Sequence, residues 1–360
     1  MKAKHYFQTA ILLSFYFMGI VTVQGQTAQI DSFLTAQIDA LHIPGLSVAI
    51  IEDGRVVTMK TYGKANIEYG IPTTSQTAFQ LASVTKLLSA TAVLTLVQEG
   101  KLDLNQKVRY YLPDLPVSWN TMKVIDLLAH QSGVADLLAL QHNFGSIDLA
   151  LDSAKAIGLE FDPGEKTVYS GGDYVVVMKL IETLTGLTFQ EFLNKNLLER
   201  LGMEHTVFNN MTQDFIYRTY DVIPFASTTY VWNAQQNRQQ IFSMMFPQWT
   251  YPAGGLYSSI EDLTKWIIAL DNHLILKPEI ADLLWTPAKL NNGSNSNFGV
   301  GWIVDKYNGE KVTGHSGGPA LADVVRLPER KITVVVLTNQ IELRPFLAMK
   351  IMDVYMKNQK

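Results

Sequence analysis

Residues 78–86, Ala78-Phe79-Gln80-Leu81-Ala82-Ser83-Val84-Thr85-Lys86, form the stretch around which the rest of this chain is organised. Ser83 and Lys86 make an S-x-x-K pair, and the residues that follow, as far as Val97, are almost continuously apolar. A helix that is apolar on every side is a buried one, and Gly100 is a suitable residue to end it. We therefore predict a central buried helix with Ser83 in its first turn and Lys86 one turn further along the same face.

This spacing suits a serine nucleophile. A serine hydroxyl is a poor nucleophile until a base removes its proton, and a lysine amine one turn away can act as that base or as its electrostatic partner. The free N–H groups at a helix N-terminus favour an oxyanion beside Ser83. The alternative is an ordinary buried helix capped by a serine, because roughly one S-x-x-K match is expected by chance in a chain of this length.

The composition limits the possible partners. The chain has 360 residues, of which 47% are hydrophobic and 17% charged, so a sizeable core is possible. The formal charge of −4 and the isoelectric point near 6.0 give no reason to expect nucleic acid or an anionic membrane as a partner. Cysteine is absent, which excludes disulfides and thiolate chemistry. No metal-ligand motif surrounds His130 or His205, so we predict structural histidines there, no metal site and no cofactor.

The N-terminus has the pattern of an export signal. Lys2 and Lys4 precede an apolar run from Ala10 to Val23, which is short for a membrane span. We predict that residues 1–25 are a signal peptide cleaved after Gly25, with an uncleaved anchor as the alternative. Cleavage would make the protein secreted or periplasmic, without stable membrane insertion.

Strand patterns occur at both ends of the remaining chain. Leu46–Ile51 and Val56–Tyr62 are rich in β-forming residues and are separated by the turn signal Asp53-Gly54. Four further strands are predicted near the C-terminus, at Gly299–Lys306, Lys311–Gly314, Ala322–Leu327 and Ile332–Leu337. Because hairpin-length links dominate, all six strands are expected to share one sheet.

The segment between these ends has a different pattern. Helical spacing recurs between loops marked by proline and glycine, although residues 217–247 are aromatic-rich and could not be assigned. We predict an α/β (α+β) fold with a mostly antiparallel sheet flanked by helices. Residues 26–103 and 251–360 would form a discontinuous sheet domain, and residues 104–250 a mostly helical insertion.

Several stretches together resemble the serine β-lactamase-like superfamily, in particular its branch of class C β-lactamases, D-Ala-D-Ala carboxypeptidases and esterases. They follow the order of the family and spread over nearly the whole chain after the signal. The matching pieces are Phe79–Lys86, Leu127–Gly133, Phe161–Glu165 with Tyr169-Ser170-Gly171, Leu201–Met203, Ala253–Leu256 and Gly314–Gly318. Each piece is common alone, but six in order are not.

The resemblance implies a role for each matching position. Ser83 would be the acylated nucleophile, and Lys86 and Tyr169 the groups that handle its proton. A phenol with a pKa of roughly 10 is a poor base at neutral pH, so Tyr169 would need the positive charge of Lys86 nearby. The backbone N–H groups of Ser83 and Gly318, the latter on an edge strand, would form the oxyanion hole. Gly171, His315, Gly317 and Gly318 would contact the substrate.

Two of these positions depart from the family pattern. The second motif usually ends in asparagine, whose amide helps to hold an acylamino group of the substrate, and here it ends in Gly171. The third motif is Lys-Thr-Gly in β-lactamases, and here it is His315-Ser316-Gly317. Histidine is mostly neutral at pH 7, so it would bind a substrate carboxylate less well than lysine does. Both changes weaken the recognition of β-lactams and of acyl-D-Ala-D-Ala.

Three other interpretations compete. Gly314–Gly318 also fits the G-x-S-x-G nucleophile elbow, but no helix is predicted directly after it and no histidine follows His315, so Ser316 is rejected as the nucleophile.

We expect an exported hydrolase that is acylated on Ser83 and cleaves small ester or D-amino-acid peptide substrates. The alternatives are a β-lactamase or D-Ala-D-Ala carboxypeptidase, and a catalytically silent cell-envelope binding protein. The sequence does not indicate an oligomeric state.

Overall fold

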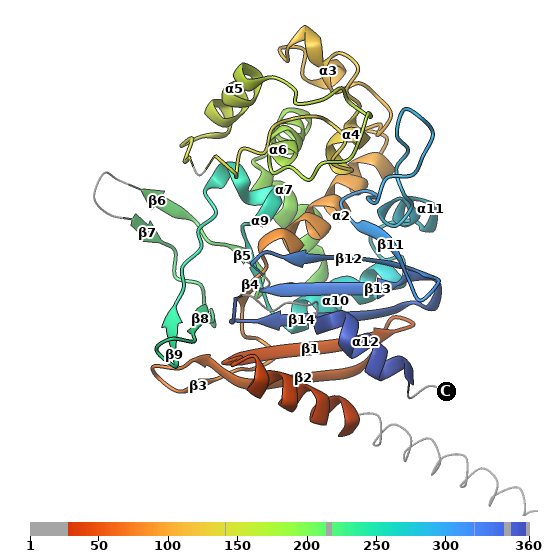
Figure 1. Ribbon diagram of the computed structural model, residues 1–360. Helices are drawn as coiled ribbons and strands as arrows, with labels where there is room; N and C mark the ends of the chain where they lie inside the picture. Colours follow the sequence, from red (N-terminus) through yellow and green to blue (C-terminus); the bar gives the residue numbers. More distant parts are fainter. Residues whose placement is uncertain (1–27, 141, 214–217, 320, 342–346, 358–360) are drawn as a thin grey trace, which may run out of the picture.

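The main sheet joins the two ends of the chain. The computed structural model describes residues 28–140, 142–213, 218–319, 321–341 and 347–357 (Figure 1). Its largest sheet has the strand order β11-β12-β13-β14-β1-β2-β3, and all its pairings are antiparallel. The first strand, β1 (Gly45–Glu52), lies between β2 (Arg55–Asn66) and the last strand, β14 (Ile332–Thr338). The predicted fold class is confirmed, whereas the predicted signal peptide lies outside the described residues.

The other strands of this sheet differ in part from their predicted bounds. They are β3 (Ile71–Pro72), β11 (Ile303–Tyr307), β12 (Glu310–Gly317) and β13 (Ala322–Leu327). β11 begins four residues later than predicted, after Gly301 in the left-handed region at φ +75°. β12 runs three residues further than predicted and so contains the third motif. The edge strands of the described sheet are β11 and β3. The prediction that the third motif lies on an edge strand was wrong, because β12 lies between β11 and β13.

The sheet is covered on both faces. Alternate residues of β14 point to opposite sides, so Val334 and Val336 pack in one core and Val335 and Leu337 in the other. The helix of residues 28–40 and helix α12 (Leu347–Lys357) cover the first face, and α10 (Ile260–Asp271) lies on the second (Figure 1). This double cover explains why β14 is buried along its whole length.

The central helix predicted from the S-x-x-K stretch is α2 (Thr85–Gln98). It is buried on every side from Thr85 to Leu96. A single 3₁₀ turn, Ala82–Val84, precedes it, so Ser83 lies on this turn and not in the first turn of the α-helix as predicted. The chain leaves the helix near Gly100, whose φ is +70°. A strand, β4 (Phe79–Gln80), leads into the turn.

Helices dominate the middle of the chain up to residue 201, and short strands follow. The helices are α3 (Val108–Tyr111), α4 (Val124–Leu128), α5 (Ile147–Ile157), α6 (Gly172–Thr185), α7 (Phe189–Leu193) and α8 (Glu199–Leu201), with a π-helical turn at Asn194–Leu198. The strands are β5 (Val207–Phe208), β6 (Met211–Gln213), β7 (Arg218–Tyr220), β8 (Tyr230–Asn233) and β9 (Arg238–Ile241). The domain boundaries at residues 104 and 250 stay a prediction.

The segment that the sequence could not assign contacts the main sheet domain. The N–H group of Tyr230 donates to the carbonyl of Asn339 at 2.7 Å, and the ring of Trp232 stacks on His42 at 3.8 Å. The chain then returns towards the central helix through α9 (Tyr251–Gly254), and β10 (Leu256–Ser258) pairs with β4 and β5. A last short helix, α11 (Pro278–Ala281), precedes the C-terminal strands.

Candidate active site

Ser83 lies on a strained turn. Ala82, the residue before it, has φ +47°, a conformation that residues other than glycine seldom adopt outside functional sites. β12 passes close to this turn: a Cβ atom added at Gly317 would lie 2.1 Å from the carbonyl oxygen of Leu81. Only glycine permits this approach, which places the third motif beside Ser83.

The structure brings Ser83, Lys86 and Tyr169 together. The Tyr169 hydroxyl donates a hydrogen bond to Ser83 Oγ at 2.8 Å, and Lys86 Nζ donates to the same oxygen at 3.4 Å. Tyr169 comes from the loop before α6, 86 residues further along the chain. Two proton-carrying groups therefore contact the serine hydroxyl, one from helix α2 and one from the loop before α6.

Burial and one backbone contact hold Lys86 in place. Its side chain is fully buried, and Nζ donates to the carbonyl of Ala253 at 2.8 Å. The ammonium group also lies 4.9 Å from the ring centre of Tyr169 and 5.1 Å from that of Tyr174. A cation near aromatic rings is attracted to them, more strongly where water is excluded. The Ala253 stretch thus helps to hold the lysine that faces the nucleophile.

His315 carries no charge in this position. Its side chain is buried, and Nδ1 donates to the carbonyl of Ser316 at 2.8 Å. Burial and the charge of Lys86 lower the pKa of His315 to about 3. Nε2 has no hydrogen-bond partner among the described residues, and the ring lies 5.7 Å from that of Tyr169. His315 therefore offers a lone pair, not a positive charge, close to the phenol.

Ser316, the rejected elbow serine, has a structural contact. It lies within β12, and its hydroxyl donates to Asp323 Oδ1 at 2.8 Å. Asp323 also accepts from the N–H group of Ala348 in α12.

The space beside Gly318 is open, since an added Cβ would have no neighbour within 4 Å. A substrate carbonyl could therefore approach the backbone at Gly318.

Two residues that the sequence did not single out fill the space beside Gly171. A Cβ atom added there would lie 2.6 Å from Leu138 Cδ1 and 3.0 Å from Asp136 Oδ1. The Asp136 carboxylate accepts from the N–H groups of Gly171 at 2.9 Å and Leu138 at 3.2 Å. A side chain at position 171 would thus collide with an apolar side chain and an acid. No local pattern marks this contact, because it joins residues 35 apart.

His130 and Asp173 lie directly beneath Tyr169, and the sequence did not identify them as part of the site. Both are fully buried, with Nδ1 of His130 2.7 Å from Asp173 Oδ2. The His130 ring lies 4.5 Å from that of Tyr169. The expectation that His130 is a hydrogen-bonded structural residue agrees with these contacts. At His205, the backbone N–H donates to Asp262 Oδ2.

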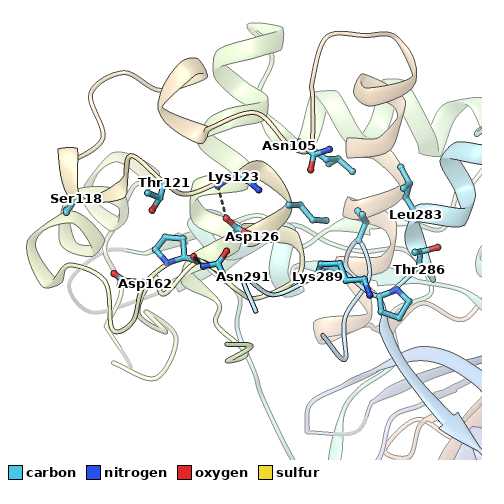
Figure 2. Close-up of a pocket in the computed structure, with 16 residues that line it drawn as sticks. Asn105, Ser118, Thr121, Lys123, Asp126, Asp162, Leu283, Thr286, Lys289 and Asn291 are labelled. Carbon is cyan, nitrogen blue, oxygen red and sulfur yellow. Dashed lines mark hydrogen bonds between the residues drawn. The ribbon is translucent and has the colours of Figure 1, made fainter. Parts of the chain in front are cut away.

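A separate cavity of about 750 Å³ lies beside α4 (Figure 2). Two of its polar lining groups have partners: Asp126 accepts from the Lys123 N–H at 2.8 Å, and the Asn291 amide donates to the Pro163 carbonyl at 2.8 Å. Burial raises the pKa of Asp126 to about 6. Ser83 is not among the residues that line this cavity. The contact with Pro163 holds the loop that leads towards Tyr169.

Two further features concern metals and membranes. Among the described residues, no group of three or more His, Asp or Glu side chains could hold a metal ion. Within the same ranges, no helix combines the length and the apolar character needed to cross a bilayer.

Comparisons with known proteins place the chain among relatives of known name and fold. The chain is similar to "Protein flp" of Staphylococcus aureus (strain COL), with 27% identity over 328 residues that cover 86% of this chain and 62% of the relative. The chain thus spans less than two thirds of that relative's length. It also resembles a solved octameric penicillin-binding protein homologue from Pyrococcus abyssi, with 26% identity, a TM-score of 0.72, and coverage of 87% of this chain and 73% of the other.

A second solved structure shares the fold. The D-amino acid amidase from Ochrobactrum anthropi SV3 superposes with a TM-score of 0.75 at 22% identity, covering 93% of this chain and 98% of the other. The family model named Beta-lactamase matches residues 30–351. Because this match covers most of the chain, the chain belongs to the Beta-lactamase family.

Proposed function

We propose that this protein hydrolyses small ester or D-amino-acid peptide substrates through an acyl-enzyme on Ser83. The observation that carries the proposal is the contact of the Tyr169 hydroxyl with Ser83 Oγ at 2.8 Å, beside Lys86 Nζ at 3.4 Å. A hydroxyl joined to two groups that can carry a proton has the arrangement required of an activated nucleophile.

The proposed reaction has two halves that use the same groups. In the first, the Tyr169–Lys86 pair starts with one proton fewer than a phenol and an ammonium together carry. Ser83 Oγ bonds to the substrate carbonyl carbon, its proton passes to this pair, and the leaving alcohol or amine takes that proton as its bond to the carbonyl carbon breaks. In the second, water attacks the acyl group, gives a proton to the pair, and the acid product departs as Ser83 regains its proton. The N–H groups of Ser83 and Gly318 would stabilise the oxyanion in both halves.

The proposed substrate preference follows from the lack of charge on His315 and from the lack of room for a side chain at Gly171. A neutral His315 cannot pair with a substrate carboxylate as a lysine would, and burial keeps it neutral at pH 7. Leu138 fills the place where an amide would hold an acylamino group. These observations favour esters and small D-amino-acid peptides over efficient turnover of β-lactams. The D-amino acid amidase with the same fold makes amide substrates a reasonable part of the test panel.

The test compares the wild type with Ser83→Ala on an activated ester, a D-Ala-D-Ala peptide and a chromogenic cephalosporin. Intact-mass spectrometry after a fluorophosphonate probe reports the covalent adduct. We expect ester hydrolysis and one adduct in the wild type, and neither in the variant. Equal ester hydrolysis by both proteins would exclude Ser83 as the nucleophile. Cephalosporin turnover of roughly 10–1,000 per second would contradict the argument from His315 and Gly171.

The second candidate is a binding protein without turnover, motivated by the missing amide at Gly171. It predicts no probe adduct on a folded wild-type protein, whereas the proposed enzyme predicts labelling. We further propose export, on the basis of the pattern in residues 1–25. N-terminal sequencing of the protein recovered outside the cytoplasm should begin at Gln26, and an intact Met1 would contradict cleavage.

A further inference from the structure

A buried hydrogen-bonded cluster beneath Tyr169 has no part in the reaction proposed above. It consists of His130, Ser132 and Asp173, and each of these side chains is at most 1% exposed. Ser132 Oγ donates a hydrogen bond to Asp173 Oδ1 and accepts one from the N–H group of Val134 at 2.9 Å. Buried polar groups are costly unless they are paired, so a cluster of three requires a reason.

The cluster holds the backbone on both sides of Tyr169. The carbonyl of His130 accepts from the N–H group of Val168 at 2.9 Å. The N–H group of Ser170 points at His130 Nδ1 at 3.3 Å, while Asp173 Oδ2 lies 2.7 Å from the same nitrogen. One histidine therefore contacts the residue before Tyr169 and the residue after it.

The imidazole also contacts the Tyr169 ring. The two ring centres are 4.5 Å apart, and the Phe298 ring lies edge-on to the imidazole at 4.9 Å. Tyr169 itself is 41% exposed, so its ring is only partly enclosed by the protein. His130 occupies the left-handed region at φ +55°, which is uncommon for a residue other than glycine and is retained where the surroundings require it.

We propose that His130, oriented by Asp173, is a positioning residue that holds the Tyr169 hydroxyl against Ser83. The pair acts through the Tyr169 loop and touches neither the substrate nor the nucleophile. Burial lowers the pKa of His130 and raises that of Asp173, which disfavours the charged form of each side chain. The inference rests on the proposed function of Tyr169.

Two substitutions of His130 separate hydrogen bonding from ring packing. His130→Asn keeps a polar group near the place of Nδ1 and suits the left-handed backbone, whereas His130→Phe keeps a ring against Tyr169 but cannot hydrogen bond. The readout is the second-order rate of labelling by a fluorophosphonate probe, with the melting temperature measured in parallel. We expect His130→Phe to label about 10–100-fold more slowly, as a displacement of about 1 Å can cause, and His130→Asn to stay within about fivefold of the wild type.

The decisive measurement repeats both substitutions in a Tyr169→Phe background. If His130 acts through the phenol, His130→Phe should slow labelling less than threefold further there. The matched control is Asp262→Asn, since Asp262, like Asp173, is a buried acid in the first turn of a long helix. Asp262→Asn should lower the melting temperature and have the same effect on labelling with or without the Tyr169 hydroxyl.

Each result has a defined meaning. The positioning role would be overturned if His130→Phe slowed labelling by the same factor with and without the Tyr169 hydroxyl. It would also be overturned if His130→Asn labelled slowly while His130→Phe labelled at the wild-type rate. A folded wild type that does not label at all would contradict the proposed function and not this inference alone. Labelling of the wild type that is lost in Ser83→Ala keeps the proposed function in place, so a failure of the double-substitution test would then apply to His130 alone.

Discussion

Tyr169→Phe removes one hydroxyl and leaves the surroundings of the ring intact. The phenol oxygen lies 2.8 Å from Ser83 Oγ, and the ring packs against His130 at 4.5 Å and Phe298 at 6.3 Å. A positioned proton-transfer group contributes about 10²–10⁴-fold to rate, which corresponds to about 3 to 5 kcal/mol of transition-state stabilisation. We expect kcat/KM for an activated ester to fall by that factor. KM should change little, because the hydroxyl faces the nucleophile.

The stability of the variant separates chemistry from folding. Tyr169 is 41% exposed, so loss of its hydroxyl leaves no buried cavity, and the free energy of unfolding should change by less than about 0.5 kcal/mol. The matched control is Tyr307→Phe, which removes a hydroxyl bonded to Asp353 at 2.6 Å outside the site and should leave the rate unchanged. The assay is steady-state hydrolysis with urea unfolding of the same samples. If Tyr169→Phe kept more than about one tenth of the wild-type kcat/KM, the phenol would not be on the proton route.

Three further predictions test the packing and the charges around the site. Gly317→Ala would place its Cβ 2.1 Å from the Leu81 carbonyl oxygen, so β12 and the turn that carries Ser83 must move apart. The rate of fluorophosphonate labelling should therefore fall more than about tenfold. An unchanged labelling rate would refute the close approach of β12 to this turn. The pKa of His315 is lowered to about 3, so between pH 6.5 and 3 the unfolded chain binds more protons than the folded one. The free energy of unfolding should therefore fall as the pH drops through this range, by up to about 1.4 kcal/mol per pH unit. His315→Gln should flatten this slope in urea titrations, and identical slopes in both proteins would show that burial does not lower this pKa. Asp271→Asn leaves the buried Arg326 guanidinium without its ion-pair partner, so the free energy of unfolding should fall by about 3 to 5 kcal/mol. A loss below about 1 kcal/mol would indicate that water reaches the pair.

Local sequence patterns were sufficient for much of the sheet and several helix ends. Asp53 and Gly54 both adopt positive φ, at 47° and 67°, as the hairpin signal requires. Ser259 directly precedes α10 and accepts a hydrogen bond from the Asp262 N–H, as a serine at a helix start commonly does. These features depend on a few adjacent residues, whose preferred conformations are the same in any fold.

Where the predictions differed from the structure, longer-range packing was the cause. The sequence pattern ended the strand at Gly314, but pairing with β13 extends β12 as far as Gly317. The S-x-x-K stretch was expected to begin as α-helix, but the close approach of β12 accompanies a separate 3₁₀ turn at Ser83. The sequence pattern of one segment does not encode where a strand more than 200 residues away in the chain will pack against it.

The sequence by itself determined the residue types that the proposed chemistry needs and the order in which they occur. It could not determine that His130 and Asp173 support the Tyr169 loop, that Leu138 and Asp136 fill the space beside Gly171, or that His315 is uncharged. Each of these depends on contacts between distant segments and on exclusion of water, and burial changes the free energy of a charge by amounts that no local spacing encodes. Tertiary structure alone therefore decided the electrostatics of the site.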